Sequence, residues 1–179
     1  MKKTLLSAVM IASFGIAALA SQAARAVDGT INFTGKVVAN SCAFSVNGGS
    51  NTNTVVLPVV FTSSLTTAGS VAGTTAFTIA ASGCDPNLTS VQAYFSGANV
   101  DATTGNLKNT GTATNVQVQL LNGTTVMPLN AASATAQNSP VGTLSSGATT
   151  MNYKVQYYAT GAVGAGLVNT SVAYTINYL

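Results

Sequence analysis

The chain has 179 residues, nearly half of them hydrophobic, with only six lysine or arginine residues and three acidic ones. Histidine is absent and every acidic residue is an aspartate, so acid–base catalysis and transition-metal binding lack their usual side chains. These counts argue against an enzyme, and we expect no cofactor and no metal site.

Residues 1–26 have the pattern of a signal peptide. Two lysines precede an uncharged apolar stretch from Leu5 to Ala20, and Ala24-Arg25-Ala26 has the form of a cleavage site. The alternative is an N-terminal membrane anchor, but the stretch is short for a membrane span. We therefore expect export, with cleavage after Ala26 because it leaves the next segment whole.

Removal of this leader changes the charge of the chain. Half of the basic residues leave with it, and the remaining charges balance: Lys36, Lys108 and Lys154 against Asp28, Asp85 and Asp101. A neutral chain offers no clustered basic patch, so nucleic acid is not an expected partner. A surface of Thr, Ser, Asn and Gly instead tolerates close packing against copies of itself, which suits a fibre subunit.

The segment that follows the leader alternates like a β-strand. One face carries small or apolar residues, namely Gly29, Ile31, Phe33, Gly35 and Val37. The simpler alternative is an ordinary first strand that folds into its own domain.

Short β-branched and aromatic runs, separated by Gly, Asn, Ser and Pro, continue to the end of the chain. They predict one all-β domain, an immunoglobulin-like sandwich, without a long helix or an internal repeat. The predicted strands are Lys36–Val46, Thr54–Phe61, Thr74–Ala81, Ser90–Ser96, Asn115–Leu121, Thr124–Leu129 after an Asn122-Gly123 turn, Thr150–Tyr158 and Ser171–Leu179. We expect an exposed loop at Asn130–Gly147 and a flexible one at Gly161–Gly166.

Cys42 and Cys84 are the two cysteines of the chain. In an exported protein, one disulfide between them is the natural interpretation. A reactive or metal-binding thiol pair is the alternative, but it has no histidine and no acidic neighbour except Asp85.

The last nine residues read as a strand with one apolar face, formed by Val172, Tyr174, Ile176 and Tyr178. No later segment is available to cover its free edge, so a docking partner is expected from elsewhere. A strand at one end of the chain and an open edge at the other suggest head-to-tail polymerisation.

Several features in this order resemble the chaperone–usher pilins, and among them the type 1-like fimbrial shaft subunits. They are the leader, Gly35 followed by Lys36-Val37-Val38 and Cys42, the run Phe77–Cys84, the strand Thr114–Leu121, the stretch Tyr157–Gly161, and Gly166 with a penultimate Tyr178. The resemblance covers the whole chain.

The resemblance implies an incomplete immunoglobulin-like sandwich that lacks its final G strand. A donor strand from a neighbouring subunit or a chaperone would complete it. It implies a signal peptide at 1–26, a donor extension at 27–38 and a pilin domain at 39–179. The donor residues would be Gly29, Ile31, Phe33, Gly35 and Val37, and the groove and chaperone-binding strand would hold Gly166, Val172, Tyr174, Ile176, Tyr178 and Leu179.

The implied function is that of a structural subunit of a bacterial surface fimbria, which supports adhesion and biofilm formation. Its partners would be copies of itself, a periplasmic chaperone, an outer-membrane usher, and a tip adaptor or adhesin subunit. The alternatives are a minor adaptor near the tip or a surface-binding adhesin module. The adhesin alternative is weaker, because the chain has no room for an additional binding domain and carries a donor-like extension.

Overall fold

The computed structural model describes residues 30–35 and 37–179. Two units are distinguished, residues 1–36 and residues 37–179, and each is considered separately. In the first unit the described residues 30–35 have no regular secondary structure and are exposed. The predicted signal peptide and Gly29 lie outside the described residues.

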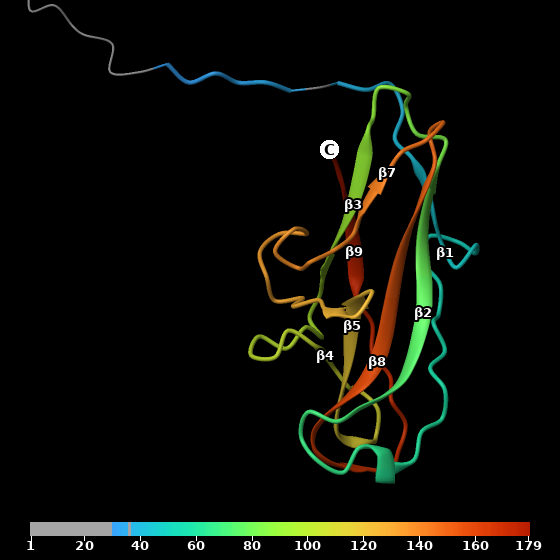
Figure 1. The fold of residues 1–179 in the computed structure, drawn as a ribbon, viewed down its shortest axis with the longest axis vertical. Coiled ribbons are helices and arrows are strands. Elements are labelled where there is room, and N and C mark those ends of the chain that lie inside the picture. The colour runs from blue at the N-terminus through green and yellow to red at the C-terminus, as the bar shows by residue number, and fades with distance from the viewer. Residues whose placement is uncertain (1–29, 36) are drawn as a thin grey trace, which may run out of the picture. The chain divides into compact units, whose positions relative to one another are not determined.

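The second unit, called the body below, is an all-β sandwich (Figure 1). Its elements are β1 Ala43–Val46, the short 3-10 helix η1 Thr62–Ser64, β2 Val71–Ser82, β3 Ser90–Ser96, β4 Leu107–Lys108, β5 Thr114–Asn122, β6 Thr125–Val126, β7 Val141–Thr143, β8 Thr149–Gly164 and β9 Ala173–Tyr178. The all-β, immunoglobulin-like prediction is confirmed.

Every strand pair is antiparallel, and the strands form two sheets. The larger sheet has the order β1-β2-β8-β5-β4, with β6 also paired to β5, and the smaller one has the order β7-β3-β9. Apolar side chains from the two sheets meet in one core. At its centre Tyr153 of β8 stacks on Phe77 of β2 at 5.2 Å and meets the edge of Phe95 of β3 at 5.3 Å between ring centroids.

Five predicted strands are confirmed, those at residues 74–81, 90–96, 115–121, 150–158 and 171–179, whereas other predicted strands and loops differ from the structure. Of Lys36–Val46 only Ala43–Val46 is a strand, and Thr124–Leu129 is reduced to Thr125–Val126. Thr54–Phe61 is not a strand. The predicted flexible loop Gly161–Gly166 is wrong in its first part, because β8 continues to Gly164.

The segment Asn130–Gly147 is not the exposed loop that its composition predicts. It contains β7, and it buries Ala134, Gln137 and Ser139. The amide of Gln137 explains the burial: its oxygen accepts the N–H of Phe95 at 2.9 Å, and its nitrogen donates to the carbonyls of Phe95 and Leu129. A polar side chain can be buried when its hydrogen bonds are satisfied in this way.

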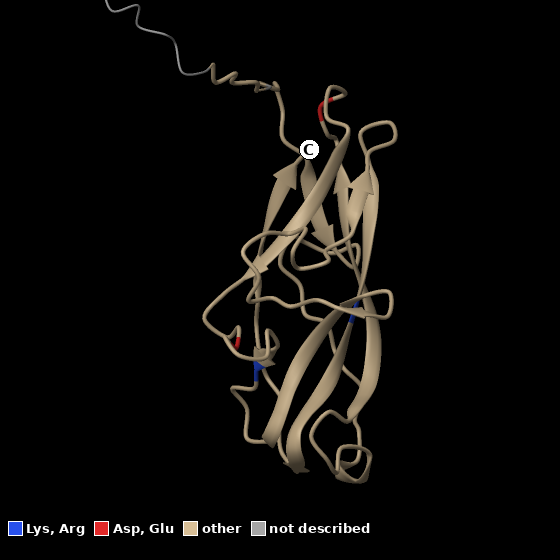
Figure 2. Cartoon of the chain, turned by 60° about the vertical axis from the view of Figure 1, so that its left-hand side comes forward, with Lys and Arg blue, Asp and Glu red and all other residues tan. Residues whose placement is uncertain are grey.

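Charged side chains are sparse over the body (Figure 2). The charged side chains among its described residues are Lys108, Lys154, Asp85 and Asp101. Across the described residues no helix is both long and apolar enough to cross a membrane.

Candidate functional site

Two edge strands of the sandwich face each other across a gap in the fold. β1 pairs with β2 alone, and β9 pairs with β3 alone, among the strands that the structure describes. The two strands come close at Phe44 and Tyr178, whose ring centroids are 6.5 Å apart. Each strand therefore presents a row of backbone N–H and C=O groups that no described neighbouring strand satisfies.

A groove of about 1350 Å³ lies between these edges, and no charged residue lines it. Its floor is made of core side chains, including Phe77, Ile79, Phe95, Val118 and Leu120. Val172, Tyr174 and Ile176 of the wall are only partly buried. An uncharged apolar groove bordered by unpaired backbone fits an extended apolar segment better than a polar small molecule.

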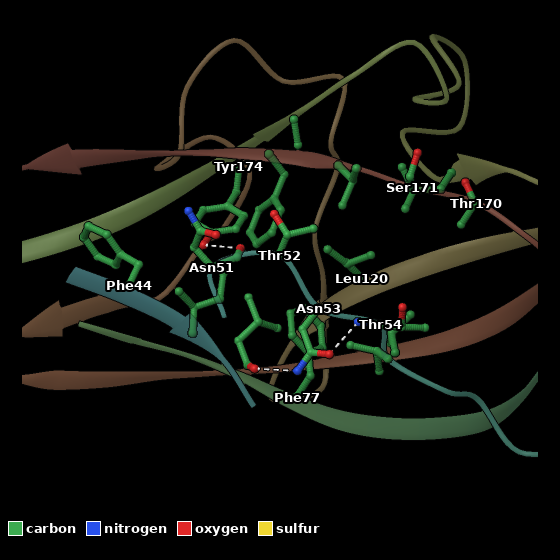
Figure 3. Close-up of a pocket in the computed structure, with 18 of the residues that line it drawn as sticks. Phe44, Asn51, Thr52, Asn53, Thr54, Phe77, Leu120, Thr170, Ser171 and Tyr174 are labelled. Carbon is green, nitrogen blue, oxygen red and sulfur yellow. Dashed lines mark hydrogen bonds between the residues drawn. The ribbon is translucent and has the colours of Figure 1, made fainter. Parts of the chain in front are cut away.

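The segment after β1 forms the other rim of the groove (Figure 3). The hydroxyl of Tyr174 donates to the carbonyl of Asn51 at 2.9 Å, and the side-chain amide of Asn53 donates to the carbonyl of Val46 at 2.9 Å. These bonds hold the rim to both β9 and β1. Burial beside the groove raises the pKa of the Tyr174 hydroxyl, so this donor stays protonated at neutral pH.

The predicted strand Thr54–Phe61 continues this rim. Val55 and Leu57 pack against the core and line the groove, whereas Val59 and Phe61 are exposed. The segment has no ladder with a described strand. Its place on the groove was not predicted from the sequence, and the apolar run that contains Val55 and Leu57 was the available signal.

The structure places four of the six predicted groove residues in the wall, namely Val172, Tyr174, Ile176 and Tyr178. Leu179 lies beyond the groove, where its N–H donates to Ser90 at 2.9 Å and its carbonyl accepts the Thr89 hydroxyl at 2.9 Å. Gly166 also lies outside. It packs on the backbone of residues 112–113, and a side chain there would collide with Ala113.

The predicted donor residues are exposed where they are described. Ile31 is 78% exposed and Phe33 is 90% exposed, and a Cβ added at Gly35 would meet nothing within 4 Å. Val37, the first residue of the body, is 99% exposed. A large apolar side chain left in water forgoes about 1.5–3 kcal/mol of burial, so these residues are suited to an external apolar site.

Cys42 and Cys84 form the predicted disulfide, next to the first residue pair of β1 and β2, Ala43 with Ser82. The following residue, Asp85, is buried and binds two segments of backbone. One carboxylate oxygen accepts the N–H of Asn87 at 2.9 Å and the other accepts the N–H of Ala39 at 3.1 Å. These N–H groups keep the pKa of Asp85 below its usual value, although burial acts in the opposite direction.

An immunoglobulin-like sandwich with one strand position open between β1 and β9 is the incomplete fold of a pilin subunit. Comparison with known proteins agrees: a family model described as "Fimbrial protein" matches residues 31–179. The chain therefore belongs to the fimbrial protein family, and it is a structural subunit of a fimbria at the cell surface.

The sequence is 46% identical over 172 residues to an F17 fimbrial protein of Escherichia coli, covering 91% of this chain and 94% of the relative. It is 44% identical over 171 residues to the major fimbrial subunit SMF-1 of Stenotrophomonas maltophilia, covering 90% and 98%.

Solved structures show the same fold. The P pilus rod subunit PapA aligns with a TM-score of 0.60 at 14% identity, covering 78% of this chain and 100% of that one. A subunit from the structure of a chaperone–usher pilus, which addresses the molecular basis of rod uncoiling, aligns with a TM-score of 0.61 at 18% identity, covering 86% of this chain and 96% of that one.

Proposed function

We propose that this subunit polymerises head-to-tail by donor-strand exchange, with residues 27–38 as the donor extension and residues 39–179 as the pilin domain. The single observation that carries the proposal is the uncharged groove between the unpaired edges of β1 and β9. The exposed apolar residues Ile31, Phe33 and Val37 are chemically complementary to it. Residues 1–26 act as the signal peptide that directs export.

The direction of the donor follows from where the chain enters the body. Ala39 is bound by Asp85, shortly before β3, and β9 ends beside the start of β3, where the N–H of Leu179 donates to Ser90. The extension thus leaves the body at the end where β9 terminates. In a fibre whose copies all point the same way, the extension enters the next groove from the opposite end and runs antiparallel to β9.

The energetics favour this occupant. Burying Phe33 and Ile31 contributes roughly 1.5–3 kcal/mol each, and each new backbone hydrogen bond along the groove adds about 1 kcal/mol. Gly35 carries no side chain, so it lets the donor backbone approach the floor closely where a larger residue would clash.

Before polymerisation, a periplasmic chaperone fills the groove, with Val172, Tyr174, Ile176 and Tyr178 as its contact strand. Gly166 belongs to the same C-terminal motif, and the carboxylate of Leu179 anchors a basic chaperone residue. An outer-membrane usher then exports the growing fibre, which carries a tip adaptor or adhesin subunit and supports adhesion and biofilm formation. This role needs neither a cofactor nor an enzymatic step.

The test mixes the purified chaperone-bound mature subunit with a synthetic peptide spanning residues 27–40. We expect the wild-type peptide to displace the chaperone and give a heat-resistant complex. A Gly35→Leu peptide should fail, and a Thr34→Ser peptide, changed on the opposite face, should act like the wild type. Equal displacement by the wild-type and Gly35→Leu peptides would contradict donor-strand exchange in this register.

A further inference from the structure

The root of the extension, residues 37–42, is attached to the body at two separate points. The first is covalent, the disulfide between Cys42 and Cys84. The second is the carboxylate of Asp85, which accepts the backbone N–H of Ala39 at 3.1 Å. One aspartate, 46 residues away in sequence, thus holds a backbone amide of the root.

The position of this second attachment is informative. Val37 is 99% exposed, whereas Val38 already packs against the core. The carboxylate binds the N–H of the residue that follows, Ala39, at the point where the chain passes from solvent into the body. The Asp85 side chain itself is only 6% exposed, and its other oxygen is fixed by the N–H and the side-chain amide of Asn87.

Two attachment points constrain a segment differently from one. With the disulfide alone, residues 38–41 could swing about Cys42, because their φ and ψ angles are the soft coordinates of the backbone. The hydrogen bond at Ala39 removes that freedom and sets the direction of the root.

We propose that Asp85 is a positioning residue that fixes the angle between consecutive subunits of the fibre. This inference rests on the proposed function, because the extension seated in a neighbouring groove is the connection between two bodies. A root of fixed direction turns that connection into a stiff joint. The groove determines whether two subunits join, and Asp85 determines the angle at which they do so.

The test compares fibres assembled from the full mature chain carrying Asp85→Asn with wild-type fibres. The substitution keeps the size of the side chain but presents an amide group, itself a donor, to the N–H group of the root. Losing hydrogen bonds of this kind shifts the ratio of attached to detached roots by roughly two- to tenfold. We expect a broader distribution of angles between neighbouring subunits in electron micrographs, and a shorter persistence length.

Asp101→Asn is the matched control. Asp101 also accepts two backbone N–H groups, from Thr103 and Thr104 at 2.9 Å each, but it closes its own loop and has no bond to the root. Its fibres should have the wild-type angle distribution. Binding of the 27–40 peptide should be unchanged in both variants, which separates joint stiffness from groove function.

The outcomes separate the two proposals. Asp85→Asn fibres with the angles and persistence length of the wild type would overturn the role of Asp85 while leaving donor-strand exchange intact. Loss of both peptide binding and fibre formation in Asp85→Asn would assign the residue to folding instead and would overturn its role in the joint. Failure of the wild type to bind peptide or to form fibres would refute the proposed function, and this inference with it.

A second measurement needs no variant. In the wild-type subunit complemented by the peptide, the amide of Ala39 should exchange with solvent at least about tenfold more slowly than in an unstructured chain. Exchange at the unstructured rate would show that the carboxylate does not hold the root, and would overturn the proposal.

Discussion

The core of the body has two regions that differ in how they are closed. In the closed region Val91, Met127, Met151 and Tyr153 are each at most 1% exposed, with both sheets packed over them. In the open region Val172, Tyr174 and Ile176 are only partly buried and face the groove. Both regions consist of similar apolar residues on antiparallel strands.

This difference separates stability from assembly. Side chains in the closed region have all their partners within the body, so their burial contributes to folding. Side chains along the groove lack partners on one side, and an incoming strand can supply them. Substitutions in the two regions should therefore affect different measurements.

The largest effect should come from removing residues 27–37 of the donor extension. The truncated body keeps both regions of the core, so it should fold and bind its chaperone, but it has no strand to offer to a neighbour. Fibre formation should fall to zero in an assembly assay with purified chaperone-bound subunit. Normal fibres from the truncated chain would show that assembly does not use this segment.

The next largest effect concerns the disulfide, which closes a loop with a sequence separation of 42 residues. Replacing both cysteines by alanine should lower the free energy of unfolding by about 4 kcal/mol in the chain-entropy model. Because Cys42 directly precedes β1, which borders the groove, the bound donor peptide should also dissociate faster. Urea unfolding and peptide dissociation of the complemented subunit measure the two effects, and an unchanged unfolding midpoint would contradict the first.

A matched pair of substitutions tests the comparison directly. Met151→Ala, in the closed region, should lower the free energy of unfolding of the complemented subunit by about 2–5 kcal/mol and leave peptide affinity within about twofold. Ile176→Ala, in the groove wall, should instead weaken peptide binding about tenfold or more, through lost apolar contact. Denaturant titration and peptide competition distinguish the two, and similar profiles for both variants would show that the regions are not separate.

The sequence predicts the closed region better than the open one. Ser90–Ser96 is found with the predicted bounds, and the cores of β2, β5 and β8 are found as well. Each of these strands lies between two neighbouring strands of the same chain, so a run of apolar and β-branched residues is enough to predict it.

Around the groove, the sequence pattern indicates that side chains are buried, but it does not indicate which strand pairs with the segment that carries them. Val55 and Leu57 of the predicted strand Thr54–Phe61 do turn inward, yet their segment has no described strand beside it. The sequence pattern cannot show whether the neighbour belongs to the same chain. In the same way, composition could not predict the burial of Gln137, because it depends on the distant backbone of Phe95.

Only one of the two walls of the groove could be predicted from the sequence. The pattern of Val172, Tyr174, Ile176 and Tyr178 indicates an uncovered strand, and all four residues line the groove. The opposite rim, formed by β1 and residues 51–57, depends on a turn after Val46 and on the bonds of Asn51 and Asn53. Such long-range bonds leave no periodic signal in the sequence.

The smallest predicted effect is a decrease in the free energy of unfolding at alkaline pH, and it originates in the closed region. The hydroxyl of Tyr153 lies 3.3 Å from the hydroxyl of Ser139, and burial raises its pKa from 10.0 to about 12. In the unfolded chain the phenol ionises near pH 10, so the unfolded state gains stability first as the pH rises. The contribution of Tyr153 is complete below about pH 10 and is lost progressively up to about pH 12, by roughly 2–3 kcal/mol in total.

Tyr153→Phe keeps the ring stacked on Phe77 but removes the titrating group, so its free energy of unfolding should fall less between about pH 8 and about pH 11. Burial also raises the pKa of Tyr157 and Tyr174, so some alkaline sensitivity should remain in this variant. Tyr174 borders the groove, and a bound donor strand buries it further. The residual sensitivity should therefore respond to complementation by the peptide, whereas the part due to Tyr153 should not.

Urea titrations of both chains at the two pH values, with and without peptide, measure this difference. An identical pH dependence for the wild type and Tyr153→Phe would mean that Tyr153 is not sealed from solvent, and the closed region would then be less closed than its burial indicates.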